Sequence, residues 1–215
     1  MPARHPATMA HTVHPEAHAI ALDRAPCTPW RNGGGVTREL LAWPHPTDWR
    51  LRISVADIGA DGPFSAFAGV RRWFALLSGD GVVLDFGGQP HALRLGDAPL
   101  AFDGAQAPGC RLLGGPVRDL NLMCSGADGG MAPAAQGQPW RPPPGAQAGL
   151  FARVAGRWRS DDLQHHLPGP GLLWLAQPPG GDWVFEPDTH APAEPDAPTA
   201  PIGWWLHFLP TDIHP

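Results

Sequence analysis

The sequence contains no lysine and no tyrosine, so all 15 of its basic residues are arginines. Because Asp and Glu together number 20, the formal net charge is −5 at pH 7 with histidine neutral. A chain of net negative charge does not attract nucleic acid or anionic lipid through its overall field. The densest basic stretch, Arg153 to Arg159 around Trp158, is interpreted as a solvated strand or turn. We therefore expect neither a nucleic-acid partner nor a membrane partner.

Cysteine is scarce as well, and Cys27, Cys110 and Cys124 form no Cys-x-x-Cys pair. An odd, scattered set does not build a disulfide framework and fits reduced thiols in a cytoplasmic protein. No apolar run approaches the roughly 18 residues that a membrane-spanning helix needs. Residues 1–22 hold Pro, Glu and four His without an apolar centre, which is not the pattern of a signal peptide.

Glycine and proline are abundant instead, with 27 and 28 residues in a chain of 215. The chain is also 43% hydrophobic and holds ten tryptophans, which indicates a packed interior rather than a disordered chain. Turn residues separate short apolar runs throughout, and no segment has a convincing helical period. The composition predicts an all-β protein.

Two apolar runs alternate with the period of a strand, RLRISVADI at 50–58 and VRDLNLMC at 117–124. One face of each run is apolar, with Leu51, Ile53 and Val55 in the first and Leu120 and Leu122 in the second. The opposite faces carry Arg52 and Ser54, and Asp119 and Asn121. A second pair of runs, 72–77 and 82–86, flanks Ser-Gly-Asp-Gly and predicts a hairpin.

The spacing of these runs predicts two sets of strands. We expect a loose leader over 1–22, a first antiparallel barrel over 23–130, a Pro-rich connector over 131–149 and a second, smaller barrel half over 150–215.

The stretch PWRNGGGVTRELLAW, Pro29 to Trp43, holds three consecutive glycines. A phosphate loop needs glycines at fixed offsets, usually a lysine, and a helix behind them, and this chain has no lysine. A turn with positive φ and close backbone approach explains the glycines better, although a simple structural joint stays open.

Several motifs then follow in order: WRNGGGVTRE, WRLRISVADIGADGPFSAFAGVRR, LLSGDGVVLDF and FDGAQAPGCRLLGGPVRDLNLM. Together they resemble the successive motifs of the HutD/Ves family, over about residues 29–124. The resemblance implies a cupin fold with two β-barrels in one chain, a bicupin. It also implies a role in histidine utilisation, as a governor of that pathway that binds N-formylglutamate.

The motif positions carried over from the family are Trp30, Asn32, Thr37, Glu39, Arg52, Ser54, Asp61, Phe64, Ser65, Asp119 and Asn121. Of these, Asp61 is expected to hold its turn. The expected ligand-binding set is Asn32, Thr37, Glu39, Arg52, Ser54, Ser65, Asp119 and Asn121. Arg52 would clamp a carboxylate with its planar guanidinium group. The alternative is that Arg52 forms a structural ion pair with Asp119 or Glu39.

Other chemistries have weaker support. The first strand set holds only His45 and His91, and the adjacent His165 and His166 would point to opposite faces of a strand, so we expect no metal and no cofactor. The histidines of the leader (His11, His14 and His18, with Glu16) could scavenge a metal. Ser54 and Ser65 do not lie in a Gly-x-Ser-x-Gly motif, so no catalytic residue is assigned.

The sequence thus predicts a metal-free cupin, in the cytoplasm, that binds a small acidic metabolite without turnover. The first alternative is a cupin-type isomerase or hydrolase acting on a small carboxylic acid, with Glu39 or Asp119 as base. The second is a protein-interaction module that uses the Trp-rich second half. A homodimer is possible in each case.

Overall fold

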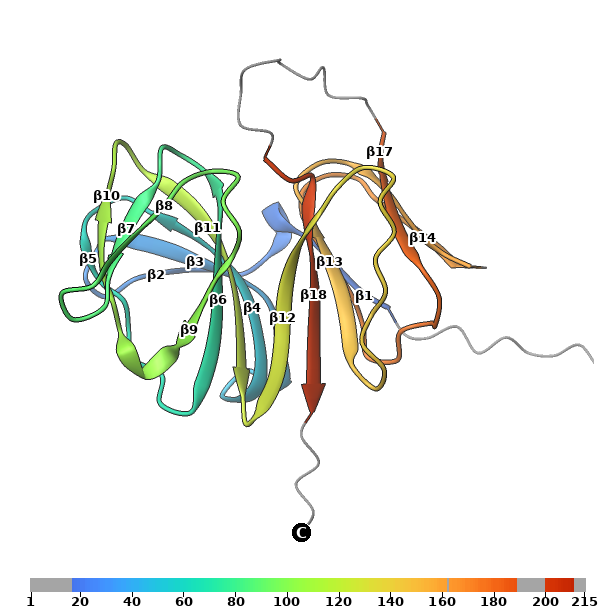
Figure 1. Ribbon diagram of the computed structural model, residues 1–215, viewed down its shortest axis with the longest axis horizontal. Coiled ribbons are helices and arrows are strands. Elements are labelled where there is room, and N and C mark those ends of the chain that lie inside the picture. Colours follow the sequence, from blue (N-terminus) through green and yellow to red (C-terminus); the bar gives the residue numbers. More distant parts are fainter. Residues whose placement is uncertain (1–16, 162, 189–199, 211–215) are drawn as a thin grey trace, which may run out of the picture.

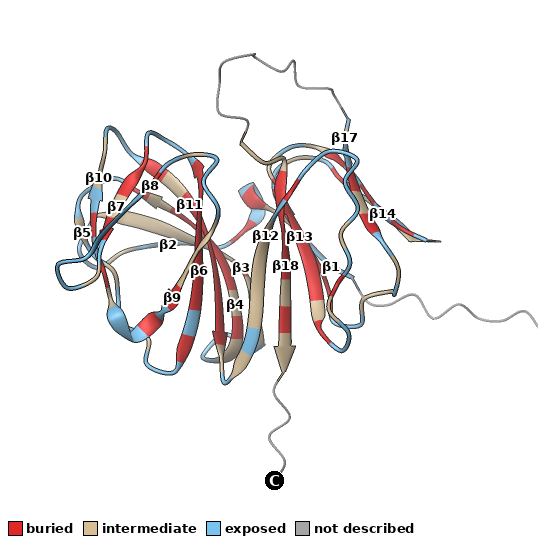
Figure 2. Cartoon of the chain, viewed as in Figure 1, coloured by how far each residue is buried: buried red, intermediate tan, exposed pale blue. Residues whose placement is uncertain are grey.

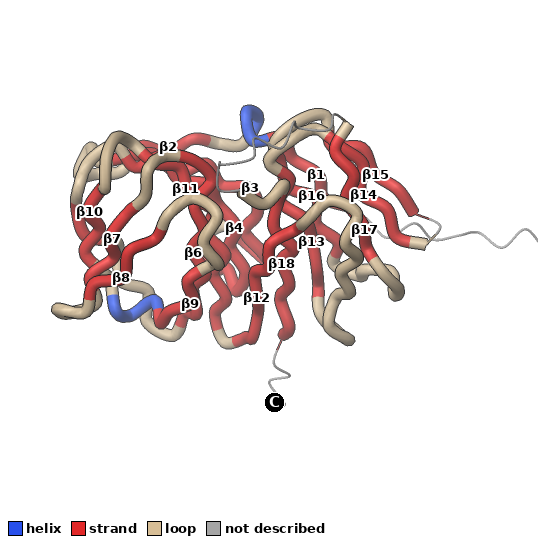
Figure 3. The backbone as a smooth tube through the Cα atoms, turned by 45° about the horizontal axis from the view of Figure 1, so that its top comes forward, coloured by secondary structure: helices blue, strands red, loops and turns tan. Residues whose placement is uncertain are grey.

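The computed structural model describes residues 17–161, 163–188 and 200–210. Strands make up nearly all of its regular structure, as Figures 1 and 3 show. The helical segments in these residues are two 3-10 turns, η1 (Leu22–Arg24) and η2 (Gly104–Gln106). The prediction of an all-β protein is therefore confirmed. None of the helices in the described residues has the length and apolar character that crossing a bilayer requires.

The first half contains two antiparallel sheets. A six-stranded sheet has the order β2 (Cys27–Pro29), β3 (Gly35–His45), β4 (Asp48–Ile58), β11 (Val117–Ser125), β6 (Val70–Ser78) and β9 (Leu100–Asp103). A four-stranded sheet has the order β5 (Gly62–Pro63), β10 (Gly109–Leu112), β7 (Val82–Asp85) and β8 (Pro90–Leu93).

The second half repeats this plan with fewer strands. Its larger sheet has the order β1 (Ala17–Ala21), β16 (Gly171–Leu175), β13 (Gln147–Ala152), β18 (Gly203–Pro210) and β12 (Ala127–Ala134). Its smaller sheet has the order β15 (Leu163–Leu167), β14 (Gly156–Ser160) and β17 (Trp183–Pro187).

The predicted alternation in β4 and β11 is confirmed, and the structure shows what each face contacts. The apolar face of β4, from Leu51 to Val55, joins a cluster with Trp204 and Phe208 of the second half. Figure 2 shows this buried zone as red stripes along β4, β6 and β13, where the halves meet. The polar face therefore points into the first half. Burial of the apolar face between the halves fixes that orientation, because a one-residue slip would reverse both faces.

Each half also has an interior cluster of its own. Phe74, Leu76 and Phe102 belong to the cluster inside the first half. Trp158, Trp183 and Trp205 belong to the cluster inside the second half.

Three boundaries differ from the sequence-based expectation. Residues 17–22 are not a loose leader, because residues 17–21 form β1 and pair with β16 from Ala17↔Leu175 to Ala21↔Gly171. Residues 127–130 are not part of the first sheet pair, because β12 pairs with β18. The expected connector 131–149 is shortened at both ends by β12 and β13. Residues 1–16, which carry His11, His14 and Glu16, lie outside the described residues.

The predicted hairpin between β6 and β7 is wrong. Gly79 and Gly81 do have positive φ, of 96° and 129°, so the turn is where the sequence places it. However, β11 and β9 already occupy both edges of β6. The chain therefore crosses to the other sheet, where β7 pairs with β10 and β8.

Candidate functional site

A cavity of about 600 Å³ lies inside the first half. Seven of the eight predicted ligand-binding residues line it: Asn32, Thr37, Arg52, Ser54, Ser65, Asp119 and Asn121. The eighth, Glu39, is not among the lining residues. The cavity volume lies in the range of small-molecule sites.

Adjacent strands bring the polar residues together. Asn121 of β11 pairs with Ser54 of β4, and Met123 pairs with Arg52. Side chains of directly paired residues have Cβ atoms about 4.5–5.5 Å apart. The polar faces of β4 and β11 thus form one continuous wall of the cavity.

The triple-glycine segment forms the turn before β3, as the turn interpretation predicts. Gly33 has a φ of +72°, and the Gly34 N–H donates to Asn32 Oδ1 at 3.0 Å. A Cβ at Gly35 would clash with the Asp57 carbonyl oxygen. The glycines therefore allow positive φ and close backbone approach, and they place Asn32 at the cavity wall.

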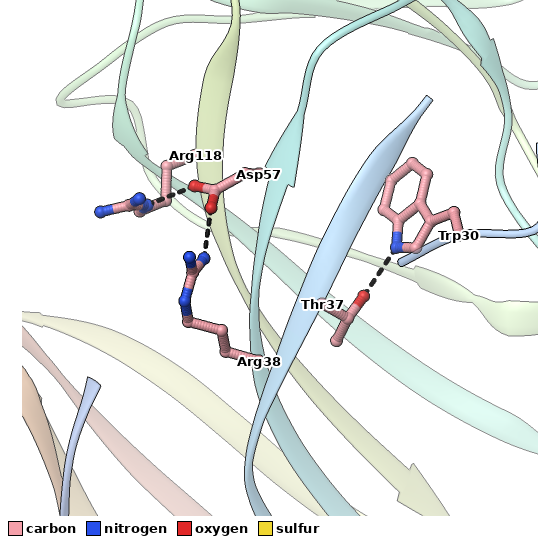
Figure 4. Close-up of polar contacts among 5 residues, drawn as sticks. All are labelled: Trp30, Thr37, Arg38, Asp57 and Arg118. Carbon is pink, nitrogen blue, oxygen red and sulfur yellow. Dashed lines mark hydrogen bonds and ion pairs between the residues drawn. The ribbon is translucent and has the colours of Figure 1, made fainter. Parts of the chain in front are cut away.

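Trp30 is held beside this turn. Its indole Nε1–H donates to Thr37 Oγ1 at 2.7 Å, as Figure 4 shows. Both residues line the cavity. The bond leaves the Thr37 hydroxyl with its own hydrogen free for another acceptor.

Arg52 makes one of the two structural pairs that the sequence left open. Its Nε donates to Glu39 Oε2 at 2.8 Å. Arg52 also lines the cavity, so Glu39 orients this guanidinium group from outside the lining. Arg52 therefore forms an ion pair with Glu39 and lines the cavity at the same time.

The sequence reasoning missed Arg72, which is the most enclosed cation of the cavity. Only 4% of Arg72 is exposed, and its Nη2 donates to Asn121 Oδ1 at 2.9 Å. Its guanidinium carbon lies 5.0 Å from the ring centre of Phe102 and 5.3 Å from that of Phe64, which are cation–π distances. Its Nε and Nη1 have no hydrogen-bond partner in the described residues. Burial lowers the pKa of Arg72 to about 10, so the side chain stays charged at pH 7.

Asp119 lies in the same cavity and is fully buried. Burial raises the pKa of Asp119 to about 8, although the Arg72 charge opposes this shift. The Asn121 amide donates to Asp119 Oδ1, whereas Oδ2 has no partner in the described residues. The raised pKa favours the protonated form of Asp119, which is able to donate a hydrogen bond. No ion pair joins Arg72 to a carboxylate in the described residues.

The signal for Arg72 was present but ambiguous. In GVRRWFALL, Arg72 stands two residues before Phe74 and thus on the same face of a strand. Both Trp73 and Phe74 are buried, so both faces of β6 are covered and the alternation does not mark an exposed face.

Two further motif residues are exposed. Ser65 lies in the loop after β5 and lines the cavity. Asp61 Oδ1 accepts a hydrogen bond from the Leu112 backbone N–H at 2.8 Å, so it ties its loop to the end of β10. In the described part of the chain, no three His, Cys, Asp or Glu side chains come together as a metal site would require.

Comparison with known proteins gives the context for this cavity. The HutD family model matches residues 23–167. An uncharacterised 21.2 kDa protein in the hutC 3′ region of Pseudomonas putida is 42% identical over 100 residues, covering 46% of this chain and 53% of that protein. Protein Ves of Citrobacter koseri is 37% identical over 105 residues, covering 47% of this chain and 54% of Ves. The matched region thus spans about half the length of these curated relatives.

Solved structures agree over a longer range. HutD from Pseudomonas fluorescens SBW25 is 25% identical, with a TM-score of 0.73 over 91% of this chain and 100% of that protein. Protein Ylba from E. coli has a TM-score of 0.62 over 94% of this chain and 93% of that chain, at 8% identity, and shows the fold alone. The fold is therefore cupin-like. The resemblance drawn from the motifs is confirmed: the chain belongs to the HutD family, which is linked to the histidine utilisation locus.

Proposed function

We propose that this chain binds a small acidic metabolite, N-formylglutamate, in the first-half cavity and thereby modulates histidine utilisation in the cytoplasm. It would do so without a metal and without turnover. The observation that carries this proposal is Arg72, a buried cation whose Nε and Nη1 have no hydrogen-bond partner in the described residues and which shares its cavity with Arg52.

The chemistry of the cavity fits such a ligand. A buried guanidinium group that lacks an anion carries a desolvation cost, which a ligand carboxylate would offset through charge-assisted hydrogen bonds. Arg72 would bind one carboxylate, and the protonated Asp119 would donate to the same anion. Arg52 would bind the second carboxylate of N-formylglutamate, while Ser54, Thr37 and Asn32 would orient the formylamide group.

We also propose that each pair of sheets forms one β-barrel, so that the chain is a bicupin. The oligomeric state, with a homodimer as one possible form, is measured by light scattering of the full chain.

The test is thermal unfolding of the full chain with N-formylglutamate, with glutamate, urocanate and histidine as comparisons. A ligand at 100 times its dissociation constant stabilises the folded state by about 2.7 kcal/mol, which raises the midpoint by roughly 5–10 °C at this length. We expect that shift with the formyl compound alone. If none of the four compounds raises the unfolding midpoint, the proposal of a histidine-pathway ligand is wrong.

Arg52→Ala separates binding from folding. Because the Arg52–Glu39 pair is partly exposed, we expect the variant to fold with a near-normal midpoint but to lose most of the ligand-induced shift. Arg111→Ala, on an exposed position of β10 outside the cavity lining, is the matched control and should keep the shift. Collapse of the Arg52 variant would instead assign Arg52 a structural role.

One observation favours the catalytic alternative, a cupin-type isomerase or hydrolase. The pKa of Asp119, about 8, lies near the operating pH that a general acid–base needs. This alternative predicts turnover of a small carboxylic acid that Asp119→Asn abolishes while binding is kept. The binding proposal predicts no turnover in either protein.

A further inference from the structure

A second cavity, of about 580 Å³, lies outside the first-half interior. Its lining comes from four segments: Ala21–Arg24, Arg38 of β3, Arg118 of β11 and Pro168–Pro170. The Leu22 N–H donates to the Pro170 carbonyl at 2.8 Å, so two of these segments are held together. The cavity is therefore a seam between the first half and the β1–β16 edge of the second.

Two strands, β3 and β11, contribute to the lining of both cavities. Thr37 and Asp119 line the first cavity, whereas their sequence neighbours Arg38 and Arg118 line the second. Asp57, on β4 between those strands, accepts hydrogen bonds from both Arg38 and Arg118, as Figure 4 shows. Burial alone would raise the pKa of Asp57, but these two arginines outweigh it and lower the pKa, so Asp57 is ionised.

The arginines have more donors than Asp57 uses. Arg38 gives Asp57 its Nη1 and Arg118 gives it Nε, so Arg38 Nε and Nη2 and both Arg118 Nη atoms have no partner in the described residues. Arg24 lines the cavity with no hydrogen-bond or ion-pair partner among those residues. Arg24, Arg38 and Arg118 outnumber the nearby carboxylates, Asp23 in the lining and Asp57 beneath it, which leaves a net positive charge.

We propose that this seam is a second binding site, for a small phosphate-type oxyanion. Three arginines on three different segments match the three strong acceptor oxygens and the near-double charge of a phosphate group. A single planar carboxylate would satisfy fewer of these donors. The site is separate from the metabolite cavity, and its existence does not depend on the function proposed for that cavity.

The test is calorimetric titration of the full chain with inorganic phosphate at pH 7.5, with chloride holding the ionic strength constant. We expect saturable binding of one phosphate per chain. Arg24→Gln should weaken binding about tenfold, because it removes one charge-assisted donor and leaves the Asp57 pairs in place. Arg111→Gln, the same change at an exposed position outside both cavities, should leave the affinity unchanged.

Two further arms identify the site and the ligand. Arg52→Ala alters the first cavity only, so phosphate affinity should stay within twofold of wild type. Acetate at equal ionic strength should bind at least tenfold more weakly than phosphate. Phosphate binding that does not saturate would overturn the proposal, and so would equal effects of the Arg24 and Arg111 changes. Loss of phosphate binding only in Arg52→Ala, or acetate binding as tight as phosphate binding, would overturn it too.

Discussion

Inside the first half, a cavity is lined by charged and polar groups, with Arg72 and Asp119 enclosed there. Inside the second half, Trp158, Trp183 and Trp205 pack together in a hydrophobic cluster without a charged side chain. Trp158 and Trp183 meet edge to face with ring centres 4.9 Å apart, a favourable aromatic geometry. Both halves are pairs of antiparallel sheets, so the side chains that point inward decide what each half can do.

This difference separates binding from stability. The second interior contributes apolar burial and aromatic packing, which stabilise the fold. The first interior keeps a buried cation with unpartnered donors, which costs stability unless a ligand supplies an anion.

The comparison also bears on a protein-interaction role for the Trp-rich second half. Trp174, Trp183, Trp204 and Trp205 are buried, and Val154 is the exposed large hydrophobic residue in the described residues. These tryptophans therefore do not form an exposed apolar surface for a partner.

The largest effect should come from the second interior. Trp183→Ala removes a fully buried ring, and loss of packing with a cavity costs about 3–5 kcal/mol. Denaturant unfolding measures this change. Ligand affinity of the folded fraction should stay unchanged, and a fall in affinity would mean that the two interiors are coupled.

The next effect concerns the first interior. Arg72→Met replaces the buried cation with a shorter apolar side chain, so ligand binding should weaken about 10- to 100-fold, the loss of a charged hydrogen bond of about 1.5–3 kcal/mol. Stability should stay close to that of wild type, because the desolvation cost of the buried cation is removed while Asn121 Oδ1 loses its donor. Calorimetry and denaturant unfolding provide the two readouts. A strongly destabilised variant would show that Arg72 is a structural residue.

The third effect is a pH dependence from Asp119, which is smaller than the first two over any one pH unit. Its pKa is about 8 in the folded chain and near 4 when unfolded, so the folded state binds one more proton between these values. Stability is then greatest below the lower value and falls as pH rises, by up to about 1.4 kcal/mol per pH unit, until about pH 8. Denaturant unfolding at pH 5, 6, 7 and 8 should show this slope in wild type and a flatter one in Asp119→Asn. Equal slopes would mean that Asp119 is ionised in the folded chain.

The smallest effect should come from the surface of the second half. Arg141 and Asp182 form an ion pair between side chains that are 68% and 54% exposed. Exposed pairs contribute about 0–1 kcal/mol, so Arg141→Gln should change the free energy of unfolding by less than about 0.5 kcal/mol. A larger loss, measured by the same unfolding experiment, would show that stability is not concentrated in the aromatic interior.

Sequence reasoning predicted what depends on local pattern. The alternation at Arg52 and Ser54 and at Asp119 and Asn121 fixed which side chains share a face, and the motif glycines identified a turn. The path of the chain depends on which strand edges are free, so the turn residues between β6 and β7 could not show that these two strands do not pair. Arg72 was missed because both faces of its strand are buried, a property of how the two halves pack together.

The most direct measurement is a crystal structure of the full chain grown with saturating N-formylglutamate. The account predicts a ligand carboxylate oxygen about 2.7–2.9 Å from the unpartnered nitrogens of Arg72. A ligand bound elsewhere, or a first-half cavity without it at saturation, would contradict the account.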